Sequence, residues 1–409
     1  MSAADGGPVS LAHGDGTIRY PVTLSIAPEE WAMSSRGLEG VVVAETELSH
    51  VYGEEGRLVY RGYEIEDLAN NATFEEVCHL LWFGELPNRA QLEELQGRLR
   101  DEQALHPKII DLLRLAPSNA HPMAVLRTAA SALGLYDPDA ENMSDEANLR
   151  KAIRLTAQMA TLTAAIDRIR NGRDPVEPRR DLGYGANLLY MLRGEEPDEL
   201  EARVLDVALT LHAEHGMNAS TFAARVTAAT LSDMHSAITS AIGTLKGPLH
   251  GGANERVMAM LLEIGEPERA EEWVRSALAR GERIMGFGHR VYKTLDPRAP
   301  ILKRLAEQLA QRGGNVRWLE IAERIRAVMA EEMERRGKRI YPNVDFFSAP
   351  VYYTLGIPTD LFTNIFAVAR TAGWTAHVME QLRENRLIRP ASEYVGPLGK
   401  KVQPIDARP

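Results

Sequence analysis

Apolar residues recur at intervals of three and four along most of the chain from Glu66 onward, which is the period of amphipathic α-helices. Alternating apolar and polar residues, typical of β-strands, are confined to the N-terminal segments 20–25, 41–47 and 57–61, the last beside a turn at 53–56. The pattern predicts a mainly α-helical protein with a few short β-strands near its N-terminus.

Start and stop signals bound several of the predicted helices. Thr73 and Glu76 have the spacing of a capping box, and Asn88 can cap a helix over residues 89–104. Ser144 precedes acidic residues that suit the positive end of a helix of about 25 residues, roughly 40 Å long. Further helices are predicted over residues 197–211, 221–242, 256–264, 267–280, 298–311, 315–336 and 363–384.

The composition is that of a globular protein with a sizeable core. Of 409 residues, 44% are apolar and 25% are charged, which argues against a disordered chain, and the length favours two or three domains. The 57 acidic residues outnumber the 47 basic ones and give a net charge of −10, which repels nucleic acid and anionic membranes. An anionic ligand must therefore meet a local basic cluster.

Cys78 is the single cysteine, so we expect neither an internal disulfide nor a cysteine-based metal site. Residues 1–16 have neither the basic start nor the apolar centre of a signal peptide, and no run approaches the roughly 18 apolar residues of a membrane span. We expect a cytoplasmic protein with a loose N-terminal tail and no membrane partner.

Four interruptions of the helical pattern concentrate His, Gly, Pro and Asp where the period calls for apolar residues. They are residues 212–218, 246–254, 285–290 and 341–347. Because each places a titratable side chain on a constrained turn, these segments are the candidates for a functional site.

Two of these segments centre on a histidine. His250 lies before a helix start, where it could stay neutral and donate a hydrogen bond to a developing oxyanion, or simply cap the helix. His289 is followed by Arg290 and Lys293, which suit a phosphate or carboxylate, or it is a turn histidine with solvated neighbours. No complete dinucleotide or phosphate-loop motif is present, so nucleotide hydrolysis is not supported.

Asp345 lies between Val344 and Phe346, and such apolar surroundings raise the pKa of a carboxylate. It could act as a general base, or it could be the N-cap of the following helix, a role for which Ser348 competes. A metal site formed by His212 and His215 is not expected, since their spacing does not match His-Glu-x-x-His and no further cysteine is available.

Together these segments resemble the citrate synthase family. Gly-Pro-Leu-His-Gly-Gly-Ala-Asn at 247–254, Met-Gly-Phe-Gly-His-Arg-Val-Tyr-Lys at 285–293 and Pro-Asn-Val-Asp-Phe-Phe at 342–347 occur in the family's order and spacing. Segments 37–42 and 60–63 also match, so the resemblance covers nearly the whole chain beyond the tail.

The resemblance implies a fold and an assembly. It indicates a mainly α, two-domain helical bundle with a large domain over residues 1–252 and 357–409, and a small domain over residues 253–356. The site is expected in the cleft between them, oxaloacetate is expected to bind first and close it, and the chain is expected to form a homodimer. The short chain lacks the extra domain of NADH-regulated forms, so no NADH inhibition is expected.

The resemblance also implies residue roles. The catalytic residues are His250, His289 and Asp345, and the oxaloacetate ligands are His215, Arg298, Arg370 and Arg389, the last acting across the subunit boundary. Coenzyme A contacts are Ile284, Gly286, Gly288, Lys293 and Lys338. The sequence departs from the family where Gly216 follows His215 in place of the usual glutamate.

The implied reaction condenses acetyl-CoA with oxaloacetate and hydrolyses citryl-CoA to citrate and CoA, with no metal or redox cofactor. The nearest alternative is 2-methylcitrate synthase, which uses propionyl-CoA. Because one methylene in an apolar pocket is worth only about 1 to 3 kcal/mol, the sequence discriminates poorly between them. Two alternatives from other classes are a metal-dependent hydrolase built on His212, His215 and His289, and a non-catalytic helical scaffold.

Overall fold

The computed structural model describes residues 36–38, 40–313 and 316–408. The chain divides into two units, residues 1–46 and 47–409, and the second contains all the elements discussed below. The strand predicted over 20–25 lies outside the described residues. The strand predicted over 41–47 is wrong, since residues 41–46 have no regular secondary structure and the Val42 side chain is exposed.

The only strands among the described residues form one small antiparallel sheet in the order β1-β2-β3. Strand β1 (Ser49–Tyr52) pairs with β2 (Arg57–Tyr60), which pairs with β3 (Tyr63–Glu64). The predicted turn at 53–56 joins β1 to β2, and Gly56 takes a positive φ of 66° there, which glycine adopts without strain. The prediction of strand over 57–61 is thus confirmed.

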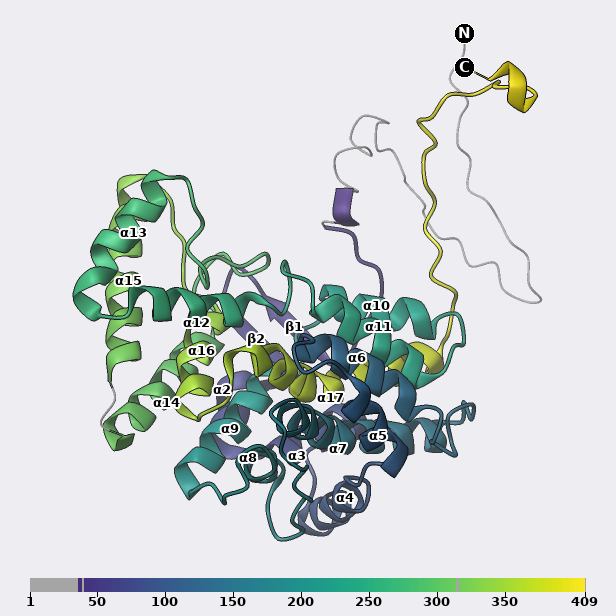
Figure 1. The fold of residues 1–409 in the computed structure, drawn as a ribbon, viewed down its shortest axis with the longest axis horizontal. Helices are drawn as coiled ribbons and strands as arrows, with labels where there is room; N and C mark the ends of the chain where they lie inside the picture. Colours follow the sequence, from purple (N-terminus) through teal and green to yellow (C-terminus); the bar gives the residue numbers. More distant parts are fainter. Residues whose placement is uncertain (1–35, 39, 314–315, 409) are drawn as a thin grey trace, which may run out of the picture. The chain divides into compact units, whose positions relative to one another are not determined.

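Helices are the main elements of the rest of this unit, joined by loops (Figure 1). Their bounds are α2 Ile65–Asn71, α3 Phe74–Phe83, α4 Arg89–Asp101, α5 Pro107–Leu115, α6 Pro122–Leu133, α7 Asp145–Arg170, α8 Tyr184–Arg193, α9 Glu199–His212, α10 Ala219–Ala228, α11 Met234–Leu245, α12 Ala253–Ile264, α13 Ala270–Ala279, α14 Arg298–Gly313, α15 Arg317–Arg335, α16 Val344–Thr354 and α17 Phe362–Arg383. The predicted mainly α fold is confirmed. No helix of the described residues is both long and apolar enough to cross a membrane.

The predicted caps lie where the sequence placed them. Thr73 and Glu76 form a reciprocal capping box at α3, and Asn88 caps α4 together with Gln91. The hydroxyl of Ser144 accepts from the backbone N–H of Ala147 at the start of α7, which has 26 residues.

The single helix predicted over residues 221–242 is wrong. The chain forms α10 and α11 there, separated by Leu231 with a positive φ of 63° and by Asp233, whose carboxylate caps α11 by accepting from the N–H of Ser236. The two helices pack against each other, so apolar residues continue across the break and conceal it in the sequence pattern.

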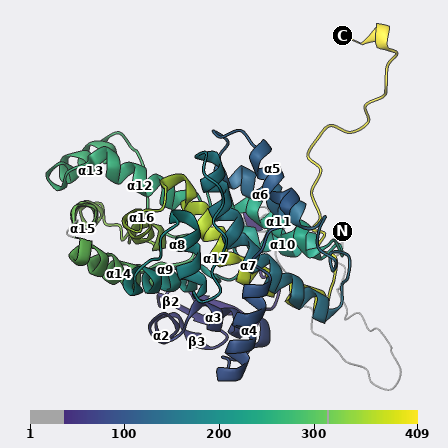
Figure 2. The same ribbon diagram turned by 60° about the horizontal axis from the view of Figure 1, so that its bottom comes forward.

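The core centres on α17, which is buried along most of its length and packs against α3, α7, α9, α10 and α11. Helices α12 to α16 gather at one end in both views (Figures 1 and 2), where α14 and α12 pack on α16 and α13 packs on α15. Of the four segments that interrupt the helical pattern, 246–252 connects the two groups between α11 and α12. The segment at 212–218 follows α9, and those at 285–290 and 341–343 lie between α13 and α14 and between α15 and α16. These segments carry the candidate site.

Candidate active site

The loop between α9 and α10 carries His215 and is anchored by α17. The guanidinium of Arg370 donates from Nε to the carbonyl of His212, 2.6 Å away. About one turn along the same face of α17 is Gly373. A Cβ at this position would clash with the carbonyl of Ala213 and the carboxylate of Glu214. The next residue on this face is His377, whose Nε2 lies 3.0 Å from Glu214 Oε1.

His215 is buried, and its Nε2 lies 3.2 Å from the hydroxyl of Tyr292. Burial and the positive charge of Arg298 hold the pKa of His215 well below its usual value. Its ring centroid is 5.3 Å from that of His289, so two of the sequence-predicted histidines lie side by side.

His250 lies in the turn before α12, but it does not cap that helix, since Gly252 is the N-cap residue. Its Nε2 instead lies 3.3 Å from the N–H of Ser220, in the first turn of α10, and 2.8 Å from the Ser220 hydroxyl. A backbone N–H can only donate, so Nε2 accepts and the proton of the neutral ring is on Nδ1.

Burial lowers the pKa of His250 to about 4, and the positive charge of Arg370 adds to this effect. The ring is therefore neutral at physiological pH. The sequence argument expected a neutral ring because of the α12 N-terminus, whereas the helix that donates to it is α10.

His289 has the opposite tautomer. The N–H groups of Val291 and Tyr292 both donate to its Nδ1 at 3.0 Å, which places the proton on Nε2. Burial lowers the pKa of His289 to about 4, with a further contribution from Arg298. Neutral His250 and neutral His289 thus each have one ring N–H group that donates to no other described residue.

Arg298 and Asp296 form a buried bidentate pair at the start of α14. Nε and Nη2 of the guanidinium lie 3.0 and 2.8 Å from the two carboxylate oxygens. Although burial opposes ionisation of Asp296, Arg298 holds its pKa below the usual value. The carboxylate of Asp296 stabilises the buried guanidinium of Arg298, whose charge acts on the pKa values of His215, His289 and Asp345.

Arg370 is buried without an ion-pair partner within 4 Å among the described residues. Its guanidinium lies 4.7 Å from the centre of the Phe366 ring, and burial lowers its pKa to about 10. An unpaired buried cation is costly, so a bound anion at this position is favoured.

Asp345 is in the first turn of α16, and the N-cap is Asn343, whose side chain accepts from the N–H of Asp345. The alternative of Asp345 as an N-cap is therefore wrong. Its Oδ1 is shielded from solvent and has no hydrogen-bond partner among the described residues. Burial raises the pKa of Asp345 to about 7, Asp296 adds to the rise, and Arg298 and Arg370 oppose it.

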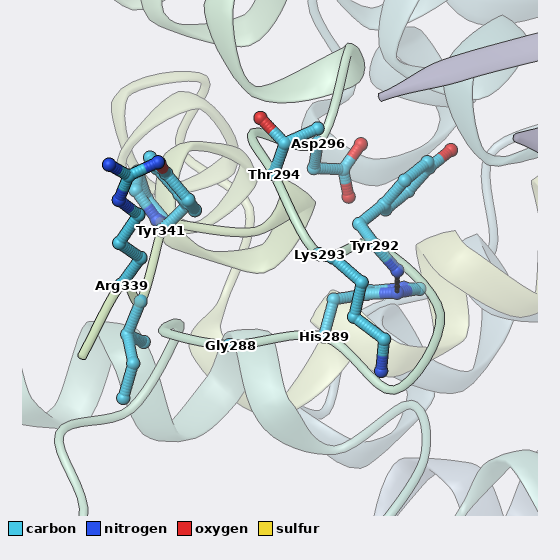
Figure 3. Close-up of a pocket in the computed structure, with 10 residues that line it drawn as sticks. Gly288, His289, Tyr292, Lys293, Thr294, Asp296, Arg339 and Tyr341 are labelled. Carbon is cyan, nitrogen blue, oxygen red and sulfur yellow. Dashed lines mark hydrogen bonds between the residues drawn. The ribbon is translucent and has the colours of Figure 1, made fainter. Parts of the chain in front are cut away.

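A cavity of about 210 Å³ opens beside His289 (Figure 3). Its lining includes Gly288, Lys293 and Arg339, the last on the segment that faces the His289 loop. Gly286 has a positive φ of 80°, and a Cβ there would lie 2.8 Å from the Phe346 ring, so this segment lies directly against α16.

The remaining predicted residues are more dispersed. Ile284 is buried, whereas Lys338 is exposed. Arg389 is also exposed, beyond the end of α17, and bonds to no other described residue. The structure of one chain therefore does not bring Arg389 to the other candidates.

No group of three or more potential metal ligands occurs among the described residues, at His212 or elsewhere. The Nδ1 of His212 donates to the carbonyl of Ala208 at 2.7 Å, and burial lowers the pKa of His212 to about 3. The ring contacts Phe366 edge-on at 5.0 Å. These contacts are those of a packed core histidine.

Sequence reasoning missed Ser220, Tyr292, Asp296, Glu214 and His377, which orient or pair with the predicted residues. Each acts on a partner distant in sequence or through an ordinary turn, although Tyr292 lies within the motif at 285–293. The Asn-x-Ser spacing at the start of α10 was the one local signal for Ser220, since Asn218 caps that helix.

Residues 37–391 match the family described as citrate synthase, C-terminal domain. The chain belongs to the citrate synthase family. Citrate synthase 2 of Bacillus subtilis is 53% identical over 376 residues, which are 92% of this chain and 99% of that protein. The chain is accordingly an enzyme of the transferase type.

Other members of the citrate synthase family bear on the site. A 2-methylcitrate synthase of Mycobacterium tuberculosis is 47% identical, over 88% of this chain and 90% of that protein. The citrate synthase of Thermoplasma acidophilum, solved as a ternary complex with carboxymethyl coenzyme A and oxaloacetate, has a TM-score of 0.87 and 35% identity, over 91% of this chain and 99% of that one.

Proposed function

We propose that the protein is a citrate synthase that condenses acetyl-CoA with oxaloacetate and hydrolyses citryl-CoA to citrate and CoA. The observation that carries the proposal is the pattern of hydrogen bonds around three residues in the family's motifs, from which their protonation states follow. His250 has its proton on Nδ1, His289 has its proton on Nε2, and Asp345 has an unbonded carboxylate oxygen and a pKa of about 7. These are the states that the condensation needs.

The first step removes a proton from the acetyl methyl group. Asp345 is the base, because an ionised carboxylate with a pKa near neutrality combines the right protonation with a strong driving force for proton transfer. The Nδ1–H of His250 donates to the thioester oxygen, where negative charge develops as the enol or enolate forms. The neutral ring suits this role because it donates without adding charge.

The second step forms the carbon–carbon bond. The enol carbon attacks the ketone carbon of oxaloacetate, and the Nε2–H of His289 supplies a proton to the ketone oxygen. Water then attacks the citryl-CoA thioester, which releases citrate and the CoA thiol. Neither a metal nor a redox cofactor has a part in this sequence.

Oxaloacetate is a dicarboxylate, and guanidinium groups match its charge. Arg370 is a buried cation without a carboxylate within 4 Å among the described residues, and Arg298 and His215 lie within its electrostatic reach. Charge-assisted hydrogen bonds of this kind are worth roughly 1.5 to 3 kcal/mol each. The ternary complex of the Thermoplasma enzyme contains this same substrate.

Arg389 completes the oxaloacetate site from the partner subunit of a homodimer. In this chain its side chain is exposed and lies on the segment after α17, so it is available to a second copy. Coenzyme A lies along Ile284, Gly286 and Gly288, with Lys293 and Lys338 near its phosphates. Citrate formation then belongs to the tricarboxylic acid cycle in the cytoplasm.

The large domain comprises residues 1–252 and 357–409, and the small domain residues 253–356. Helices α12 to α16, which lie together at one end, belong to the small domain (Figure 2). Oxaloacetate binds first and closes the cleft, which excludes water while the reactive carbon nucleophile exists.

A second candidate is 2-methylcitrate synthesis from propionyl-CoA, because a relative with that name is 47% identical. The relatives of higher identity that carry the name citrate synthase favour acetyl-CoA. Steady-state assays with oxaloacetate and either thioester decide between them. We expect a larger kcat/KM for acetyl-CoA, whereas a larger kcat/KM for propionyl-CoA identifies the second activity.

A further inference from the structure

We propose that the β1–β2 hairpin (residues 49–60) is a positioning element of the active site, which holds the loop of His289 against the loop of His215. The inference rests on the proposed function for its kinetic test. The hairpin contributes no group to the reaction. It acts through two contacts, one at each end of β1.

The first contact joins Ser49 to the His215 loop. The hydroxyl of Ser49 donates to Glu214 Oε1 at 2.9 Å and accepts from the N–H of Gly216 at 3.0 Å. It thus bonds on both sides of His215. The same carboxylate is bound by His377 from α17, so the loop is clamped between the strand and that helix.

The second contact joins Gly53 to the His289 loop. The carbonyl of Gly53 accepts from the N–H of Lys293 at 2.9 Å. A Cβ on Gly53 would lie 2.5 Å from the carbonyl oxygen of Val291, and one on Gly56 would lie 2.7 Å from that of Leu295. The two glycines let the turn lie directly against the backbone of the loop.

The segment held by Gly53 is the one that fixes His289. The N–H groups that place the His289 proton come from Val291 and Tyr292, immediately before Lys293. The Tyr292 hydroxyl reaches His215, 3.2 Å away, so the loop touches both histidines (Figure 3 shows His289, Tyr292 and Lys293 on this loop). Holding the loop therefore sets both the proton position and the spacing of the histidines.

The variants that test this are Gly53→Ala and Ser49→Ala. Gly53 has no positive φ, so alanine is allowed by the backbone and only the contact with Val291 is disturbed. Glu54→Ala, an exposed position on the same turn, is the matched control. Gly97→Ala is a second control, because a Cβ there meets nothing within 4 Å.

We expect Gly53→Ala to lower kcat/KM for oxaloacetate at least about tenfold, since displacements near 1 Å can cost far more. Ser49→Ala should have a smaller effect in the same direction, and KM for acetyl-CoA at saturating oxaloacetate should change less than twofold. Equal rises in KM for both substrates that track a fall in Tm would overturn the proposal, as would kcat/KM values for oxaloacetate within twofold of wild type.

Hydrogen exchange tests the contact without any assay. The amide of Lys293, in a peptide covering residues 289–296, should exchange faster in Gly53→Ala than in wild type or Glu54→Ala. Unchanged exchange would contradict the proposal. A wild-type protein that forms neither citrate nor 2-methylcitrate would refute the proposed function, while the exchange result would still decide for or against the hairpin contact.

Discussion

Two carboxylates near Arg370, Glu214 on the α9–α10 loop and Asp345 in the first turn of α16, have opposite properties. Glu214 is fully buried, and its Oε1 lies within hydrogen-bond distance of Ser49, His377 and the N–H of Gly216. Burial opposes its ionisation, but His377 and then Arg370 hold its pKa below the usual value. Asp345 has a shielded oxygen without any partner among the described residues, and its pKa rises to about 7.

The contrast distinguishes a carboxylate that supports a loop, Glu214, from one that can exchange a proton, Asp345. Glu214 has three donors on Oε1, so it keeps its charge and fixes a loop even though its Oε2 has no partner among the described residues. A carboxylate without donors readily takes a proton. The arginines differ in the same way, because Arg298 is paired with Asp296 and Arg370 has no ion-pair partner within 4 Å in the described part of the chain. The proposed function gives proton transfer to Asp345 and an oxaloacetate contact to Arg370, the members of the two pairs without such partners.

Asp345→Asn should have the largest effect on the reaction. The amide keeps the shape of the side chain but cannot accept the methyl proton, so kcat should fall by about 10² to 10⁴. A coupled assay of CoA release measures this. Glu214→Gln is the matched control and should lower kcat far less, so equal losses in the two variants would remove the distinction between the carboxylates.

Arg370→Leu should have the next largest effect, on oxaloacetate binding. Losing two charge-assisted hydrogen bonds to a carboxylate should raise KM for oxaloacetate by about 10² or more. Steady-state kinetics at saturating acetyl-CoA measure it. An unchanged KM would show that Arg370 does not bind the substrate.

The smallest expected effect is on stability, and its sign differs between the two carboxylates. At pH 8, Asp345→Asn should stabilise the fold by about 1 kcal/mol, because an ionised carboxylate without hydrogen-bond partners is costly and asparagine is neutral. Glu214 has a lowered folded-state pKa, so it contributes stability above its unfolded pKa, and that stability is fully present at pH 8.

Glu214→Gln should therefore destabilise the fold at pH 8 by about 1 kcal/mol or more. Thermal unfolding of the two variants beside wild type measures both signs. Shifts of the same sign in Tm would contradict the conclusion that the charge of Asp345 lacks hydrogen-bond donors while that of Glu214 has them.

The sequence predicted most of the fold because its helices carry local signals. Capping at Thr73, Asn88 and Ser144 depends on residues within one turn, and all three are confirmed. The helix over 221–242 was wrong because two packed helices share one apolar period. The strand predicted over 41–47 was wrong because an alternating apolar and polar pattern does not by itself place a neighbouring strand beside the segment.

For the site, the family motifs predicted which side chains take part but not which residues contact them. The proton position of His250 depends on Ser220, 30 residues away, and the support of Glu214 depends on His377, 163 residues away. No local pattern records such contacts. The roles of Arg389 and Lys338 stay predictions, because both side chains are exposed in a single chain.

The pH dependence of kcat/KM for acetyl-CoA, at saturating oxaloacetate, tests most directly whether Asp345 is the base. Only the ionised carboxylate accepts a proton, and bound oxaloacetate offsets the charges of Arg298 and Arg370 that lower its pKa. The account predicts a tenfold loss per pH unit below an apparent pKa of about 7 or higher, with no second loss until His250 and His289 protonate near pH 4. A profile that is flat from pH 8 down to pH 5 would contradict it.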